Sequence, residues 1–156
     1  MRIKMETLLC TTVKLENNYI EEWVRYYQEL GIDKIVIFDN NSTNGEHITD
    51  VPYVKELAEQ GYIIVVPQYD ARGIQTAQYT ECYNLFYKDY DWIMFFDVDE
   101  YLTFENCSNI KEYLSQEKFN GFDMIHVQWK IFDDNEQLYV KDGNYSLRSR
   151  FTHALD

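Results

Sequence analysis

Two aspartates separated by one residue follow an apolar stretch of the sequence. Asp97-Val98-Asp99 comes directly after residues 92–96, which are continuously apolar. Alternate residues at a strand end can point toward one place, and a divalent cation relieves the repulsion between neighbouring carboxylates. Mg2+ and Mn2+ prefer carboxylate oxygens and complete their coordination with substrate phosphates. The pair therefore predicts a divalent-cation site, with a solvated acidic turn as the structural alternative.

Polar residues also follow two earlier apolar stretches. Residues 39–42, Asp-Asn-Asn-Ser, come after the stretch over 34–38, and a second polar cluster covers residues 11–16. An Asx turn would explain the first cluster, because Asn, Asp and Ser side chains bond to their own backbone. The second could equally be a charged loop. Both clusters are therefore ligand-binding candidates with a plain structural alternative.

The chain carries far more acidic than basic side chains. Its 156 residues include 27 Asp and Glu against 14 Lys and Arg, a formal net charge of −13. This balance argues against binding to a nucleic-acid backbone, which requires Lys and Arg to release counterions. It does not exclude a nucleotide that is held through a divalent cation.

The spacing of the cysteines and the hydropathy of the chain bear on where in the cell the protein is located. Cys10, Cys82 and Cys107 form no C-x-x-C pair, which favours reduced thiols over a disulfide framework or a zinc site. No stretch reaches the ~18–20 apolar residues of a membrane span. The N-terminus makes a poor signal peptide. We therefore expect a cytoplasmic protein, for which peripheral attachment to a membrane stays open.

Strand and helix signals alternate along the chain. In the first helix Asn18 is the expected N-cap, Glu21 completes a capping box, and Gly31 suits the left-handed position after the C-terminus. The aromatic residues of the third helix are expected in the core; they are Tyr79, Tyr83, Phe86 and Tyr87. The expected strands are residues 8–13, 34–38, 62–66, 92–96 and 123–129, and the expected helices are residues 20–30, 54–61, 76–88 and 110–114.

Apolar strands separated by amphipathic helices describe βαβ units around a mostly parallel sheet. We therefore expect an α/β protein with a three-layer α/β/α arrangement, formed by a single domain over residues 1–156. Ligands of such sheets bind beyond the carboxyl ends of the strands. Because residues 11–16, 39–43 and 97–100 all lie at such ends, the architecture should bring them onto one rim.

In sequence order these clusters resemble the donor-binding part of a GT-A glycosyltransferase domain, of the family 92-like, family 2-related group. The resemblance extends from about residue 8 to residue 132. Its most specific part is Asp97-Val98-Asp99-Glu100, since the group's motif usually reads Asp-x-Asp-Glu-Phe. The other matching segments are Cys10-Thr11-Thr12-Val13-Lys14-x-Glu16, Glu21-Glu22-Trp23-Val24-x-Tyr26-Tyr27, Leu30-Gly31-Ile32-Asp33-Lys34-Ile35, Phe38-Asp39-Asn40-Asn41-Ser42, Gln78-Tyr79-x-x-Cys82 and Trp129-x-x-Phe132.

The resemblance implies a Rossmann-like nucleotide-binding topology. It also implies transfer of a sugar, with inversion, from a nucleotide-diphosphate donor such as a UDP-sugar to a glycan or lipid-linked acceptor. Asp97 and Asp99 would hold Mn2+ or Mg2+ on the donor diphosphate, where the metal acts as a Lewis acid. Asp39 would bond to the nucleoside, and Glu100 and Trp129 would border the donor sugar or the acceptor. The other residues implied to line the donor-nucleotide site are Thr11, Thr12, Val13, Glu16, Gln78 and Val98.

Two positions depart from the group's pattern: Leu15 stands where Asn is usual, and Tyr27 where His is frequent. The chain also ends soon after the Asp-x-Asp block. We therefore expect a C-terminally shortened domain that lacks most of the acceptor-binding part, and the catalytic base stays unassigned. Candidates for the base are Asp133 and Asp134, which carry carboxylates after Trp129, and a candidate for a third metal ligand is His153.

Two alternatives remain. The first is a module that binds a nucleotide sugar or a protein partner without turnover, since the acceptor machinery is missing. The second is a haloacid-dehalogenase-type phosphatase, whose motif places a nucleophilic aspartate after an apolar strand. Tyr101 stands where that motif has Thr or Val, and three expected strands precede it although the motif normally opens its domain. The glycosyltransferase interpretation is therefore preferred.

Overall fold

The computed structural model describes residues 5–134, 136–137, 139–140 and 143–155. The chain divides into two compact units, Met1–Tyr113 and Leu114–Asp156, and each is described by itself. The expectation of a single domain over the whole chain stays a prediction.

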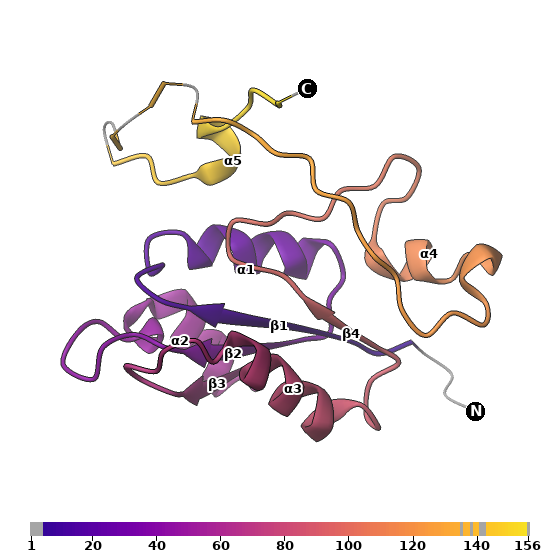
Figure 1. Ribbon diagram of the computed structural model, residues 1–156, viewed down its shortest axis with the longest axis horizontal. Helices are drawn as coiled ribbons and strands as arrows, with labels where there is room; N and C mark the ends of the chain where they lie inside the picture. The colour runs from indigo at the N-terminus through magenta and orange to yellow at the C-terminus, as the bar shows by residue number, and fades with distance from the viewer. Residues whose placement is uncertain (1–4, 135, 138, 141–142, 156) are drawn as a thin grey trace. The chain divides into compact units, whose positions relative to one another are not determined.

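The first unit is built on a four-stranded parallel sheet (Figure 1). Its strands lie in the order β3-β2-β1-β4, and each neighbouring pair is parallel. The prediction of an α/β protein with a Rossmann-like parallel sheet is confirmed. The strands are β1 (Thr7–Val13), β2 (Lys34–Asp39), β3 (Ile63–Pro67) and β4 (Trp92–Phe95).

Helices connect successive strands and cover both faces of the sheet. Two of them, α1 and α2, share one face, where the Arg25 guanidinium stacks 3.7 Å from the ring centroid of Tyr53. In the described part of the chain, α3 covers the other face. No described helix is long and apolar enough to cross a membrane. The helices of this unit and the one that begins at its end are α1 (Ile20–Glu29), the 3-10 turn η1 (Ile48–Asp50), α2 (Pro52–Glu59), α3 (Gln75–Phe86) and α4 (Ile110–Leu114).

The two faces follow from the alternation of side chains along the central strands. Leu8 and Cys10 of β1 form a buried cluster with Val36 and Phe38 of β2, and Cys82 of α3 packs among them. The residues between these in sequence are buried on the opposite face. Burial on both faces requires strands that are apolar throughout, as these two are.

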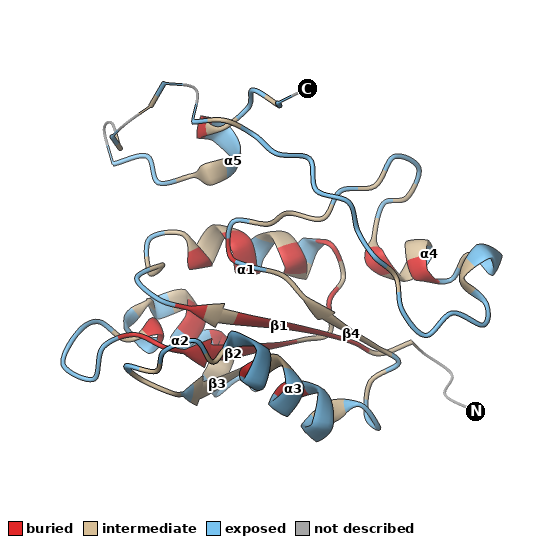
Figure 2. Ribbon diagram, viewed as in Figure 1, coloured by how far each residue is buried: buried red, intermediate tan, exposed pale blue. Residues whose placement is uncertain are grey.

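The face under α3 is less completely covered (Figure 2). Tyr83 is 51% exposed and Tyr87 is 48% exposed, and their rings stack on each other. The expectation that the aromatic residues of α3 lie in the core is therefore wrong for these two. Tyr79 and Phe86 do pack against the buried cluster. Helical spacing identifies residues that share a helix face, but it does not tell whether another element covers that face.

The sequence predicted the C-terminal end of α1 correctly but not its N-terminal end. The C-terminal prediction is confirmed, because Gly31 has a backbone φ of +94°, which residues other than glycine rarely adopt. The N-terminal prediction is wrong. The N-cap is Tyr19, without a side-chain hydrogen bond, and the N–H groups of Tyr19 and Ile20 donate to the backbone oxygen of Glu16. A backbone turn at Glu16 therefore replaces the expected capping box.

The second unit contains little regular structure among its described residues. Residues 123–129, which were expected to form a strand, form none, and Met124 and Trp129 are 68% and 79% exposed. A strand needs a partner for its backbone N–H and C=O groups, and no described residue pairs with this segment. The regular elements here are η2 (Glu117–Phe119), α5 (Leu147–Arg150) and an antiparallel bridge between Phe132 and Ala154.

We predict that Asp33 stabilises the first unit, because it ties the start of β1 to α4. Its Oδ2 accepts the backbone N–H and the hydroxyl of Thr7, both at 2.9 Å, and its Oδ1 pairs with Lys111. Asp33→Ala should lower the free energy of unfolding by about 1–3 kcal/mol, since the buried donors of Thr7 lose this acceptor. Urea unfolding at pH 7 measures the loss, with the exposed Asp89→Ala as the control.

The same pair of variants predicts a pH dependence. Burial raises the pKa of Asp33, but Lys111 and Thr7 together lower it further, so its net pKa lies below the usual value. A carboxylate with a lowered folded-state pKa stabilises the fold above its unfolded pKa and loses this contribution as the pH falls through its folded pKa. The loss of unfolding free energy in Asp33→Ala, relative to the wild type, should therefore become smaller below about pH 4. An equal loss at pH 3 and pH 7 would contradict a role for the ionised carboxylate.

Candidate functional site

The two aspartates of the Asp-x-Asp motif lie on a tight turn directly beyond β4. The backbone oxygen of Asp97 accepts the N–H of Glu100 at 3.0 Å, and the N–H of Asp97 donates to Oε2 of Glu100 at 3.0 Å. Val98 is buried at the centre of the turn, while Asp97 and Asp99 are exposed. The strand ends at Phe95, so a turn presents the two carboxylates, and not the pleat of a strand end as the sequence had suggested.

Buried aromatic residues of α1 hold this turn from one side. The indole N–H of Trp23 and the hydroxyl of Tyr27 each donate to the backbone oxygen of Glu100 at 3.1 Å. The Tyr27 hydroxyl also accepts the N–H of Leu102 at 3.1 Å, and burial raises the pKa of Tyr27. The tyrosine that departs from the related group's pattern thus bridges two backbone groups after the motif. No local pattern in the sequence indicates this role, because Tyr27 and Leu102 are far apart along the chain.

The N-terminal part of α3 holds Asp97 from the other side. Oδ1 of Asp97 accepts the side-chain amide of Gln75 at 2.8 Å and the hydroxyl of Tyr79 at 3.1 Å. Gln75 was not among the predicted site residues, and Tyr79 was expected in the core. The topology carried a usable signal, because a helix that follows β3 begins at the same rim as the carboxyl ends of the strands.

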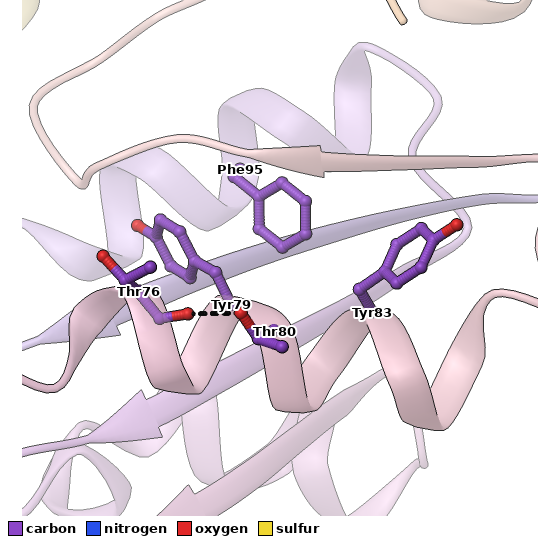
Figure 3. Close-up of a pocket in the computed structure, with 5 residues that line it drawn as sticks. All are labelled: Thr76, Tyr79, Thr80, Tyr83 and Phe95. Carbon is purple, nitrogen blue, oxygen red and sulfur yellow. Dashed lines mark hydrogen bonds between the residues drawn. The ribbon is translucent and has the colours of Figure 1, made fainter. Parts of the chain in front are cut away.

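A shallow hollow of about 280 Å³ continues from Tyr79 along α3 (Figure 3). The ring of Tyr79 packs 4.9 Å from that of Phe95, centroid to centroid, so Tyr79 connects this hollow with Asp97. The residues that line the hollow are Thr76, Tyr79, Thr80, Tyr83 and Phe95.

A third carboxylate, that of Glu16, lies in the electrostatic field of the two aspartates. Burial, and then the charges of Asp99 and Asp97, raise the pKa of Glu16 to about 7, although a hydrogen bond from the Lys14 N–H opposes this shift. Glu16 follows β1, whereas the aspartates follow β4. The sheet order changes direction between these two strands, which is the place where ligands of doubly wound sheets bind.

The carboxylates fit a cation that also binds a ligand's phosphates. In the described ranges no group of three or more His, Cys, Asp or Glu side chains is arranged to hold a metal ion by itself. Asp97 and Asp99 supply two exposed carboxylates. Mg2+ is usually bound through one or two carboxylates, waters and substrate phosphates, and not by a cage of protein ligands alone. The donor set therefore suits such an ion.

The end of β1 is linked to α3 by side-chain amides. The Thr12 hydroxyl donates to Oε1 of Gln78 at 2.7 Å, and Nε2 of Gln78 donates to Oε1 of Gln68 at 3.0 Å. Thr11 and Val13 have buried side chains, so a ligand would meet their backbone first. The predicted donor-site residues Thr12, Gln78 and Glu16 thus gather at one rim. Their binding role stays a prediction.

Asp39 shapes the loop after β2 from inside the protein. Its side chain is 1% exposed, its Oδ1 accepts the N–H of Asn41 at 3.2 Å, and its Oδ2 accepts the N–H of Ile48 at 2.9 Å. The first of these bonds is the Asx turn of the structural alternative. The imidazole Nδ1 of His47 lies 4.0 Å from Oδ2. A contact between Asp39 and a nucleoside stays a prediction.

The remaining predicted site residues belong to the second unit. Oδ2 of Asp133 lies 2.7 Å from Nδ1 of His153, so these two candidates pair with each other. Oδ1 of Asp134 accepts the N–H of Glu136 at 2.9 Å. Trp129 is largely exposed. Their proposed roles as catalytic base, metal ligand and sugar contact stay predictions.

Glu16→Gln should raise the stability of the ligand-free protein at pH 8, because it removes a charge that burial, and then the charges of Asp99 and Asp97, disfavour. The folded-state pKa of Glu16, about 7, lies above its usual 4.5, so the folded protein binds a proton that the unfolded chain releases between these values. Wild-type stability should therefore fall as the pH rises from about 5 to 8, and the advantage of Glu16→Gln should grow over the same range.

Thermal unfolding at pH 5 and pH 8 measures this difference. Glu46→Gln, which removes an exposed carboxylate from the loop after β2, is the matched control and should show no such change. The same melting temperature for Glu16→Gln and wild type at both pH values would show that folding does not raise the pKa of Glu16.

Comparison with known proteins identifies relatives over most of the chain. The family model of glycosyltransferase family 92 matches residues 9–153. A glycosyltransferase family 92 protein of Ricinus communis is 33% identical over 100 residues, which is 64% of this chain and 17% of that protein. One of Arabidopsis thaliana is 28% identical over 102 residues, 65% of this chain and 17% of that protein. No solved structure matches the chain significantly.

A rice relative of the same family, from Oryza sativa subsp. japonica, is 24% identical over 106 residues, 68% of this chain and 18% of that protein. The chain thus spans less than a fifth of the length of these three relatives. The family match nevertheless covers both the Asp-x-Asp turn and the strands that position it. The chain belongs to glycosyltransferase family 92.

Proposed function

We propose that the chain is the donor-binding part of a metal-dependent glycosyltransferase of the GT-A type. It would bind a nucleotide-diphosphate sugar, with UDP as the expected nucleotide, for inverting transfer to a glycan or lipid-linked acceptor. The observation that carries the proposal is the exposed pair Asp97 and Asp99, held on a tethered turn where the strand order reverses. Membership of a glycosyltransferase family supplies the reaction class.

Mn2+ or Mg2+ is the proposed cation. When bound it would neutralise the negative charge that develops on the departing nucleotide diphosphate. Asp97 and Asp99 would hold it, because both are exposed and stand on the same turn. The bonds from Trp23 and Tyr27 to the backbone after the motif would keep this turn in place when a ligand binds.

The nucleoside would lie along the ends of β1 and β2. The partly exposed side chains of Thr12 and Gln68, which the buried Gln78 links, offer a hydroxyl and an amide there. Asp39 supports this surface indirectly, since its carboxylate orders the backbone of residues 41–48. Glu100, whose Oε2 accepts the N–H of Asp97, would border the donor sugar or the acceptor beside the Asp-x-Asp turn.

Binding without turnover is the second candidate, because the catalytic base is not assigned. The phosphatase interpretation is not retained, because the chain belongs to a glycosyltransferase family. A panel of nucleotide sugars separates the two remaining candidates: slow release of free nucleotide indicates catalysis, and binding without release indicates a module.

Asp99→Ala should abolish Mn2+-dependent binding of UDP, because it removes one of the two proposed cation ligands from an exposed position. Isothermal titration calorimetry of UDP in the presence of MnCl2 measures the binding. The matched control is Asp89→Ala, which removes an exposed carboxylate from the loop that leads into β4, away from the strands' carboxyl ends. Circular dichroism should show both variants folded. Equal binding of UDP by the wild type with and without EDTA would disprove the metal bridge.

A further inference from the structure

We propose that Gln75 and Tyr79 restrict Asp97 to binding a cation through one carboxylate oxygen, and that this restriction selects Mg2+ or Mn2+ over Ca2+. The inference rests on the proposed function, because it concerns the cation of the same site. It assigns a positioning role to two residues of α3 that do not themselves bind the cation. It also names a property, cation selectivity, that the Asp-x-Asp motif alone does not determine.

The two residues converge on one atom of Asp97. Nε2 of Gln75 lies 2.8 Å from Oδ1, and the hydroxyl of Tyr79 lies 3.1 Å from the same oxygen. Nε2 of Gln75 is also 3.0 Å from the Tyr79 hydroxyl oxygen, so the three groups form a closed triangle. Among the described residues, the other oxygen, Oδ2, accepts no hydrogen bond. The carboxylate therefore has one engaged oxygen and one available oxygen.

The groups of this triangle belong to α3 and to the end of β4. Tyr79 packs its ring against Phe95 of β4, so its hydroxyl position depends on the sheet as well as on α3. Gln75 is the first residue of α3. On the other side, the N–H of Asp97 donates to Glu100. Both the backbone and the side chain of Asp97 are thus held before any ligand arrives.

The consequence for a cation follows from the lone pairs of the carboxylate. Each carboxylate oxygen offers about two acceptor positions, and two donors occupy those of Oδ1. A cation is then left with Oδ2 alone. Mg2+ requires near-ideal octahedral geometry and accepts single oxygens from each ligand, whereas Ca2+ takes 6–8 oxygens and often binds a carboxylate through both. A carboxylate that can offer only one oxygen therefore disfavours Ca2+ more than the smaller ions.

Tyr79→Phe and Gln75→Met test this mechanism with little change in shape. Tyr79→Phe keeps the ring on Phe95, and Gln75→Met keeps the length of the side chain without its amide. Tyr83→Phe is the matched control, because Tyr83 lies one turn further along α3 and its side chain is half exposed in the same hollow (Figure 3). Thermal unfolding without metal should show all three variants folded.

The measurement is the dissociation constant of Mn2+ by electron paramagnetic resonance in the presence of UDP, and that of Ca2+ by competition. In the double variant Mn2+ should bind about tenfold or more weakly, as is typical when the partners of metal ligands are removed. Ca2+ should lose less affinity, or gain some, because Asp97 can now offer both oxygens. The preference for Mn2+ over Ca2+, given by the ratio of the two dissociation constants, should therefore decrease. A general loss of structure would not produce such a change in preference.

The outcomes separate this inference from the proposed function. If wild-type protein binds Mn2+ with UDP and the ratio of Ca2+ to Mn2+ constants is the same in the variants, the positioning role is wrong and the metal site stands. If the wild type shows no Mn2+-dependent binding of UDP, both are wrong. A shift of the ratio in Tyr83→Phe equal to that in Tyr79→Phe would also overturn the role assigned to the Asp97 hydrogen bond.

Discussion

Mutual repulsion of carboxylates at the rim of the sheet is the constraint on which the site depends. Asp97 and Asp99 stand on one turn, and burial, with a further contribution from their charges, raises the pKa of Glu16 at the end of β1. Like charges at short range favour a bound proton or a bound cation. The fold resists their separation through hydrogen bonds from α1 and α3 to the turn. The protein therefore holds in place an arrangement that a divalent ion would relieve.

The same rim is stiffened by contacts between loops that are distant in sequence. Asn40, just after β2, exchanges two side-chain hydrogen bonds with the backbone of Ala71, after β3. Thr43 donates its N–H and its hydroxyl to Asp70. These bonds use short polar side chains and do not require a hydrophobic core under the loops. A ligand at this rim would meet a largely preformed surface, which lowers the entropy lost on binding.

The net charge of −13 has a narrower meaning in the light of the fold. Some carboxylates serve the structure: Asp39 is buried under backbone amides, and Asp33 joins β1 to α4. Others gather where the strand order reverses, at Glu16, Asp97 and Asp99. Charge counted over the whole chain argues against a nucleic-acid backbone as a partner, but it does not separate these uses. The position of each carboxylate relative to the sheet makes that distinction.

Sequence alone determined what depends on neighbouring residues: the apolar strands β1 to β4, the helices between them, the left-handed Gly31 and the place of the Asp-x-Asp motif after an apolar strand. Tertiary structure decided what depends on contacts between distant residues. It showed that residues 123–129 have no strand partner, that Asp39 is buried, and that Gln75 and Tyr27 hold the turn of the motif. The reason is physical. Periodicity and turn chemistry act over a few residues, whereas a hydrogen bond between α3 and the end of β4 exists only once the sheet has brought them together.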